Sequence, residues 1–114
     1  MTDPRAIHLT MLDKRRPALV LSRHWAIDRL NGVVVAPITS TVRGLDTELP
    51  VGPANGLDRE GVVNLDGTSR VTRESLGRPI GFLLAHQERA LTEALLAAFD
   101  LQTRWLDTRR GGFT

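Results

Sequence analysis

The sequence predicts an α+β domain that is mainly β, in which a small, strongly curved antiparallel barrel or sheet carries one helix near the C-terminus. Several short apolar segments of strand length follow one another, and 10 Gly and 6 Pro residues punctuate the chain. Helical periodicity occurs only once, over residues 84–99. The 114-residue chain is long enough for one such domain and too short for two.

The first half of the chain contains three predicted strands. Residues 7–12 alternate imperfectly, and residues 17–22 form an apolar run that begins at a Pro, where a missing N–H costs little. Residues 23–32 predict a loop with one helical turn. Residues 33–40 begin with three β-branched residues in a row, which predicts the central strand of the sheet.

The second half predicts shorter strands and then the helix. One strand is expected around residues 48–51, between long turns rich in Gly, Pro, Asn and Asp, and a short buried strand over residues 61–66. Residues 69–83 predict two strand fragments separated by one helical turn. The helix is predicted from its apolar face, which comprises Leu84, Leu91, Leu95, Ala98 and Phe99.

The sequence predicts a domain boundary near the end of the chain. Residues 102–114 carry no apolar period that could dock them, so residues 1–101 are expected to form the domain and residues 102–114 a C-terminal tail that the activity does not need.

Positive charge is concentrated in the first third of the chain. Up to Arg43 there are seven Lys and Arg against three Asp and Glu, a balance of +4, and only one of the chain's 15 cations is a lysine. Arginine forks match phosphate and stack on bases, which favours nucleic acid as a partner; a GC-rich genome explains the same bias. The run "DKRR" at residues 13–16 is either a solvated charge cluster or a site for a polyanion.

Several classes of protein are not expected. The chain has no Cys, which excludes a disulfide framework and a thiolate zinc site, and its three His are far apart, so no metal site is expected. It shows no signal peptide and no apolar run near the roughly 18 residues of a membrane span. A cytoplasmic protein without membrane contact is predicted.

Three motifs, taken together, resemble the MazF/PemK family of bacterial toxins, which includes the Kid branch. They are "RRPALVLS" at residues 15–22, "VVVAPITSTVRGLDTELP" at residues 33–50 and "GVVNLDGTSRVTRESLGRPIG" at residues 61–81. The resemblance covers residues 7–101. It implies an SH3-like barrel with a C-terminal helix, of the PemK/CcdB-like type, assembled as a homodimer and neutralised by a cognate MazE-like antitoxin.

The resemblance also implies an activity: sequence-specific cleavage of single-stranded RNA without metal or other cofactor. The 2′-OH attacks the adjacent phosphate and leaves a 2′,3′-cyclic phosphate and a 5′-OH. This chemistry needs a base for the 2′-OH proton, an acid for the leaving oxygen, and positive charge or donors for the phosphorane.

Carried over from the family motifs, the catalytic residues are Arg16, as a phosphate clamp, and Thr39, as a hydroxyl donor. A strand-end hydroxyl bonded to backbone is the structural alternative for Thr39. The residues expected to bind RNA are Lys14, Arg15, Ser40, Thr41, Asn64 and Arg70.

Two carboxylates are possible catalytic residues. Asp66 matches a catalytic Asp of the Kid branch, but Asn64 replaces the Arg that accompanies it there, and capping of a turn is the alternative role. Asp13 is the only carboxylate in a loop that is shorter than in many relatives; it is a candidate base, or merely pairs with Lys14 or Arg15.

Two other functions remain open. The chain could poison DNA gyrase by binding, as CcdB-like toxins do on the same barrel, or it could bind RNA without cutting it. An acidic, partly disordered antitoxin segment is expected to cover the basic groove, with Leu45, Leu49 and Trp25 as candidate contacts and core packing as the alternative for the last two.

Overall fold

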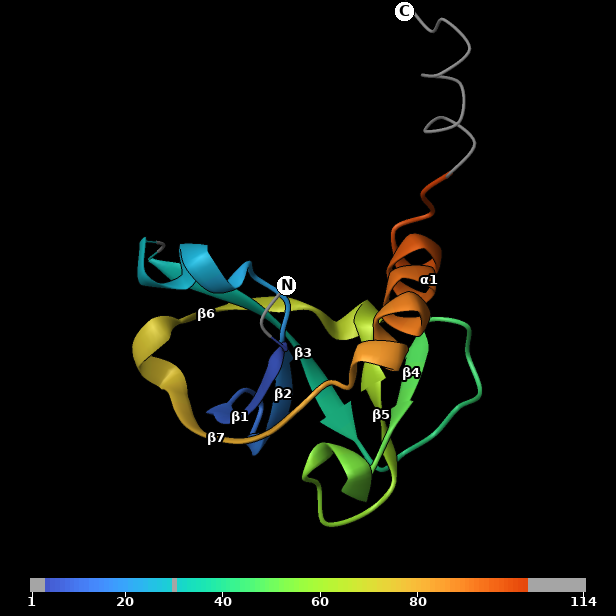
Figure 1. Ribbon diagram of the computed structural model, residues 1–114, viewed down its shortest axis with the longest axis horizontal. Helices are drawn as coiled ribbons and strands as arrows, with labels where there is room; N and C mark the ends of the chain where they lie inside the picture. The colour runs from blue at the N-terminus through green and yellow to red at the C-terminus, as the bar shows by residue number, and fades with distance from the viewer. Residues whose placement is uncertain (1–3, 30, 103–114) are drawn as a thin grey trace, which may run out of the picture.

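The computed structural model describes residues 4–29 and 31–102, apart from the side chains of His24 and Trp25. Figure 1 shows a curved sheet with one α-helix at its side. The strands are β1 (Ala6–Met11), β2 (Arg15–Val20), β3 (Gly32–Thr39), β4 (Glu48–Val51), β5 (Gly61–Asn64), β6 (Ser69–Thr72) and β7 (Leu76–Phe82). The helix α1 spans Glu88–Ala98, and short 3₁₀ turns occupy several of the connections.

Strand β3 is the centre of the sheet. The pairing order is β4-β5-β3-β2-β1-β7, with β6 also paired to β3, and every pair is antiparallel. Along its length β3 exchanges partners: residues 32–35 pair with β6, and Ile38 and Thr39 pair with β5. The predicted fold class is confirmed, and within the described residues the sheet stays open, because β4 and β7 at its two ends are not paired.

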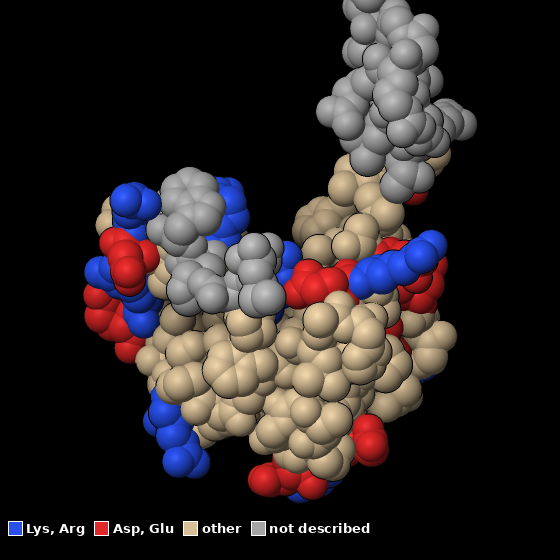
Figure 2. Space-filling view, viewed as in Figure 1, with Lys and Arg blue, Asp and Glu red and all other residues tan. Residues whose placement is uncertain are grey.

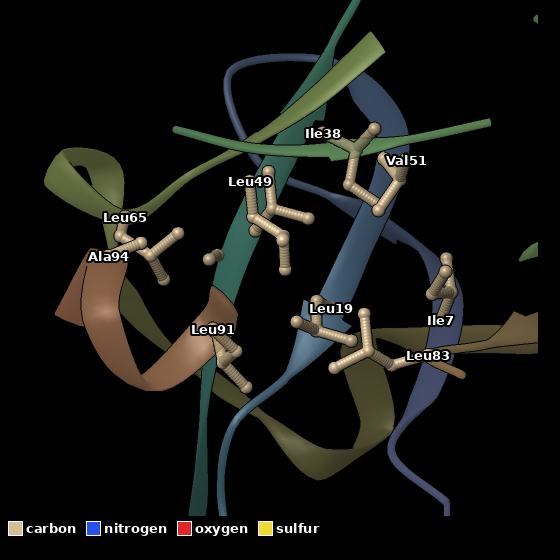
Figure 3. Close-up of a cluster of buried hydrophobic side chains, with 11 residues drawn as sticks. Ile7, Leu19, Ile38, Leu49, Val51, Leu65, Leu83, Leu91 and Ala94 are labelled. Carbon is tan, nitrogen blue, oxygen red and sulfur yellow. The ribbon is translucent and has the colours of Figure 1, made fainter. Parts of the chain in front are cut away.

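Both faces of β2 are buried, which is why residues 17–22 read as a continuous apolar run. Leu19 packs into the main core, shown in Figure 3, whereas Ala18 and Val20 pack into a second cluster with Val33 and Val35 of β3. The main core comprises Ile7, Leu19, Ala36, Ile38, Leu49, Val51, Val63, Leu65, Leu83, Leu91 and Ala94.

The helix closes one side of the main core. Leu91 and Ala94 are buried, and Leu95 and Ala98 pack partly against the same cluster. Phe99, expected on the buried face, is instead 56% exposed. The α-helix ends at Ala98 and Phe99 is its C-cap residue, directly before Asp100, which takes a positive φ of 55°. Phe99 therefore lies at the exposed end of the helix, where the chain changes direction.

The predicted strands match the observed ones to within a few residues. Strand β2 begins at Arg15, two residues before Pro17, because β1 extends the pairing to Met11 opposite Arg15. The predicted tail from Thr103 onward lies outside the described residues. Over the part of the chain that is described, no helix combines the length and hydropathy that crossing a membrane requires.

Candidate functional site

The register of the central strands brings Arg16 and Thr39 together. The pairing of β2 with β3 ends at Ala18 and Pro37, and Arg16 and Thr39 each lie two residues beyond that pair. Both residues line the same two grooves, so two residues that are 23 apart in the sequence meet at one place.

Two grooves meet at this pair. The first has a volume of about 910 Å³ and lies between the hairpin end of β1 and β2, the end of β3, the loop before β5, and β7. The second, of about 370 Å³, lies on the other side, between the β1–β2 turn, the segment after β3, and the start of β4. Arg16, Thr39 and Thr41 line both grooves.

The first groove is rich in cations. Its charged lining residues are Lys14, Arg16, Arg59 and Arg78 against Asp58 and Glu60. Four cations facing two acids give it a positive balance, which suits a polyanion. In Figure 2, other Lys, Arg, Asp and Glu side chains gather at the left of the molecule, over the region of β6 and the turn that follows it.

Arg16 is held by Asp13. Its Nε donates to Asp13 Oδ1 at 3.0 Å and one terminal nitrogen donates to Oδ2 at 2.8 Å, so the guanidinium grips the carboxylate with two prongs. Asp13 thus pairs with Arg16, not with Lys14 or Arg15 as its structural alternative assumed. The Arg16 hydrogen bonds hold the pKa of Asp13 below its ordinary value, which makes this carboxylate a weaker base.

The short hairpin turn makes that pair possible. The N–H of Leu12 donates to the carbonyl of Lys14 at 3.0 Å, which closes the turn directly after β1. Asp13 at its tip is largely exposed, whereas the Arg16 side chain is only 19% exposed. The guanidinium is therefore held by a bidentate contact with an exposed carboxylate.

Thr39 keeps its hydroxyl hydrogen available. The backbone N–H of Thr41 donates to Thr39 Oγ1 at 3.1 Å, which is the contact of its structural alternative and uses the oxygen as an acceptor. A hydroxyl that accepts in this way can still donate, so Thr39 can give a hydrogen bond to a phosphate oxygen. Ser40 lines the first groove beside it.

Asn64 and Asp66 take different positions. Asn64 lines the second groove, and its Oδ1 accepts the backbone N–H of Asp66 at 3.0 Å. The Asp66 carboxylate accepts from Thr47 Oγ1 at 2.6 Å. The turn is therefore capped by Asn64 and not by Asp66, whose carboxylate instead contacts Thr47.

Three predicted site residues, Arg15, Asp66 and Arg70, line neither groove. Arg15 is exposed opposite Met11. Arg70 pairs with Val34, and its side chain lies over Gly32 at the far end of β3. Seven residues of strand, roughly 23 Å, separate Gly32 from Thr39, so Arg70 cannot reach the same phosphate.

Sequence reasoning missed six charged groove residues: Arg43, Glu48, Asp58, Arg59, Glu60 and Arg78. Signals for three of them were present. Arg43 and Glu48 belong to the same motif as Thr39, and Arg78 precedes Pro79 just as Arg16 precedes Pro17. No comparable sequence signal identifies the loop of residues 58–60.

The residues predicted to contact an antitoxin differ in their exposure. Leu49 is 2% exposed and belongs to the core, as its packing alternative held, whereas Leu45 is 47% exposed. The side chain of Trp25 is outside the described part of the chain. Within residues 4–29 and 31–102, no three His, Asp or Glu side chains gather as a metal-ligand set.

Comparisons with known proteins show the family of this chain. The family described as "PemK-like, MazF-like toxin of type II toxin-antitoxin system" matches residues 7–99. "Endoribonuclease MazF3" of Mycobacterium tuberculosis is 54% identical over 97 residues, which is 85% of this chain and 94% of the relative. The relative is named an endoribonuclease, which favours the nuclease interpretation over gyrase binding.

Solved structures resemble the fold. "Mycobacterium tuberculosis toxin MazF-mt6" superposes with a TM-score of 0.84 at 53% identity, over 86% of this chain and 99% of that one. "Endoribonuclease in complex with its cognate antitoxin from Mycobacterial species" superposes with a TM-score of 0.76 at 22% identity, over 90% and 97% of the two chains, and shows the shared fold alone. The family match and the MazF3 identity both span most of the chain, so this protein belongs to the PemK-like, MazF-like toxins of type II toxin–antitoxin systems.

Proposed function

We propose that this protein is an endoribonuclease toxin that cuts single-stranded RNA at specific sequences without metal. One observation carries the proposal: Arg16 and Thr39 lie together where two grooves meet. A substrate cut within its chain needs a path on each side of the reacting phosphate, and the two grooves provide these paths.

The proposed reaction is a transesterification. The 2′-OH loses its proton to a base and attacks phosphorus, the bond from phosphorus to the 5′ oxygen breaks, and that oxygen takes up a proton. Arg16 leaves Asp13 and grips the phosphate with the same two prongs, while Thr39 donates to a non-bridging oxygen. Both donors neutralise charge that grows in the phosphorane, so they act most strongly in the transition state.

Incubation of the purified protein with total RNA in excess EDTA tests the function. We expect discrete fragments whose 5′ ends accept phosphate from a kinase without prior dephosphorylation and whose 3′ ends carry a cyclic phosphate. Intact RNA together with trapped DNA gyrase would support the CcdB-like alternative. Retention of RNA without cutting would support a binding protein.

Asp13 is expected to compete with the substrate for Arg16. Asp13→Asn removes a negative charge and weakens the grip on the guanidinium, so we expect RNA to bind about 3- to 10-fold more tightly. Because the Arg16 hydrogen bonds lower its pKa, Asp13 is ionised throughout the neutral range and is a poor base. The single-turnover rate should therefore change less than about 3-fold.

The measurement for Asp13 is RNA affinity and single-turnover cleavage from about pH 5 to pH 9. The pKa of Asp13 is lowered in the folded protein, so its ion pair with Arg16 persists above that pKa and is lost only in stronger acid. The wild type should therefore show no rate inflection from Asp13 in this pH range, and neither should Asp13→Asn. A loss of roughly 10²–10⁴-fold in rate with RNA binding intact would instead make Asp13 the base.

We propose that the toxin is a homodimer. Small domains bury little of their own surface, and large apolar side chains, including Phe82, Phe99 and Leu101, are about half exposed. In Figure 2 the centre of the visible face, over β7 and the segment leading to α1, consists of side chains other than Lys, Arg, Asp and Glu. A monomer mass by light scattering at micromolar concentration would contradict the dimer.

We also propose that a cognate antitoxin silences the toxin in the cytoplasm, by analogy with the mycobacterial endoribonuclease that has been solved in complex with its cognate antitoxin. Arg16 already donates two hydrogen bonds to the Asp13 carboxylate, so an acidic segment could take the same place and block the phosphate site. Exposed Leu45 lies beside the second groove on the segment before β4, where it could receive an apolar anchor. Binding of an acidic antitoxin peptide should weaken when Arg16 is replaced.

A further inference from the structure

The segment of residues 41–45, between β3 and β4, has no regular structure, but the side chain of Glu48 holds three of its backbone N–H groups. The Glu48 carboxylate accepts three consecutive backbone N–H groups, from Arg43 at 3.1 Å, Gly44 at 2.9 Å and Leu45 at 3.2 Å. The Arg43 N–H also reaches the second carboxylate oxygen at 3.3 Å. Charge-assisted hydrogen bonds of this kind fix the path of a segment that has no strand partner.

Two features allow this arrangement. Gly44 has a φ of 75°, a conformation that lets neighbouring N–H groups point to one side. Glu48 begins β4, where it pairs with Asn64 of β5 and precedes the buried Leu49. The carboxylate is thus fixed to the sheet, and it fixes the segment in turn.

The fixed segment presents a cation to the second groove. Arg43 lines that groove together with Arg16 and Thr39. Among the described residues, its guanidinium makes no hydrogen bond or ion pair, and the residue is exposed. The Glu48 carboxylate makes its hydrogen bonds to backbone groups, and no ion pair joins it to the Arg43 guanidinium.

We propose that Arg43 is a substrate-contacting residue, which binds the RNA phosphate next to the one that is cut, and that Glu48 is a positioning residue acting through Arg43. This inference rests on the proposed endoribonuclease activity. It gives the second groove a phosphate-binding end that is separate from Arg16.

The first test is Arg43→Ala, measured by steady-state cleavage of a mapped oligoribonucleotide. Loss of one phosphate contact should raise KM about 10-fold and change kcat less than about 2-fold. The slope of log affinity against log salt should fall in magnitude by about 0.7, the value for one phosphate contact on a single strand. Arg89→Ala, an exposed cation on α1, removes the same charge outside both grooves and serves as the control.

The second test, Glu48→Gln, separates positioning from charge by the sign of its effect. Removal of a negative charge beside a polyanion should tighten binding if charge alone matters. If Glu48 positions Arg43, KM should instead rise about 5-fold, because an amide oxygen holds three N–H groups less firmly than a carboxylate. In the Arg43→Ala background the same change should have almost no further effect on KM. Glu93→Gln on α1 is the matched control.

Gly44→Ala provides an independent variant if Glu48→Gln fails to fold. A Cβ at Gly44 would contact nothing within 4 Å, so this change disturbs only the backbone conformation and should reproduce the rise in KM. Unchanged KM in Arg43→Ala, tighter binding by Glu48→Gln, or additive effects in the double variant would overturn the inference. Absence of cleavage by the wild type would instead overturn the proposed function.

Discussion

Replacement of Arg16 by alanine is expected to slow single-turnover cleavage by at least about 10²–10³-fold, or about 3–4 kcal/mol of transition-state stabilisation. The two-pronged contact with Asp13 shows that the guanidinium is already positioned for a bidentate oxygen partner. Arg16→Lys should rescue little, because a point charge cannot reproduce two parallel hydrogen bonds. Thr39→Ala should lose less, since its hydroxyl is neutral.

The controls for Arg16 address charge and folding. Arg15→Ala removes the same charge one residue away, outside both grooves, and should mainly weaken binding and flatten its salt dependence. Thermal melting should show that Arg16→Ala stays folded, because its partner Asp13 is exposed and Arg16 belongs to neither core cluster. An Arg16→Ala protein that folds and cuts at nearly the wild-type rate would remove Arg16 from the mechanism.

Gly81→Ala is expected to destabilise the fold by about 3 kcal/mol. A Cβ at Gly81 would overlap the carbonyl oxygen of Asn55 and lie 2.8 Å from its carbonyl carbon and 3.1 Å from the Gly56 Cα. These are backbone atoms of the loop that packs on β7, so no side chain can rotate away to make room.

The loop cannot simply withdraw from β7. The side chain of Asn55 is buried and accepts from the N–H of Gly52 at 3.1 Å, while its amide donates to the carbonyl of Phe82 at 3.0 Å and to Gln87 Oε1 at 2.6 Å. Any shift that accommodates the methyl group breaks part of this buried network.

Thermal and chemical denaturation at one fixed protein concentration measure the effect of Gly81→Ala. A fall in Tm of roughly 15 °C corresponds to the expected loss for a domain of this size. Gly44→Ala is the matched control, because it meets no atoms and should cost only about 1 kcal/mol for its positive φ. If the two variants melt within a few degrees of each other, close packing of the loop on β7 is not what Gly81 provides.

Local sequence predicted the strands well and the contacts between side chains poorly. Residues 33–40 were predictable as the central strand because β-branched residues fit a pleated, buried position in a sheet. The burial of Phe99 was predicted wrongly because periodicity cannot show where a helix stops, and the helix stops at Ala98.

The site was predictable only as far as the motifs reached. Arg16 and Thr39 were identified from the family resemblance, and the strand register then brings them together. The Asp13 contact depends on the closure of a short turn, and the Glu48 contacts depend on the φ of Gly44; neither conformation can be read from residue types. The distance of Arg70 from Thr39 could not be predicted, because nearness to Asp66 in sequence does not show at which end of β3 a residue lies.

The exchange of partners along β3 determines which parts of the sheet can unfold locally. Because β3 is covered by β2, β5 and β6, its amide protons should exchange with solvent only when most of the domain unfolds, whereas β4 and β7 at the ends of the sheet can fray independently. Thr39 ends this most protected strand, and Arg16 lies on its neighbour. Fluctuations that loosen the edges of the sheet would therefore leave the distance between these two side chains almost unchanged.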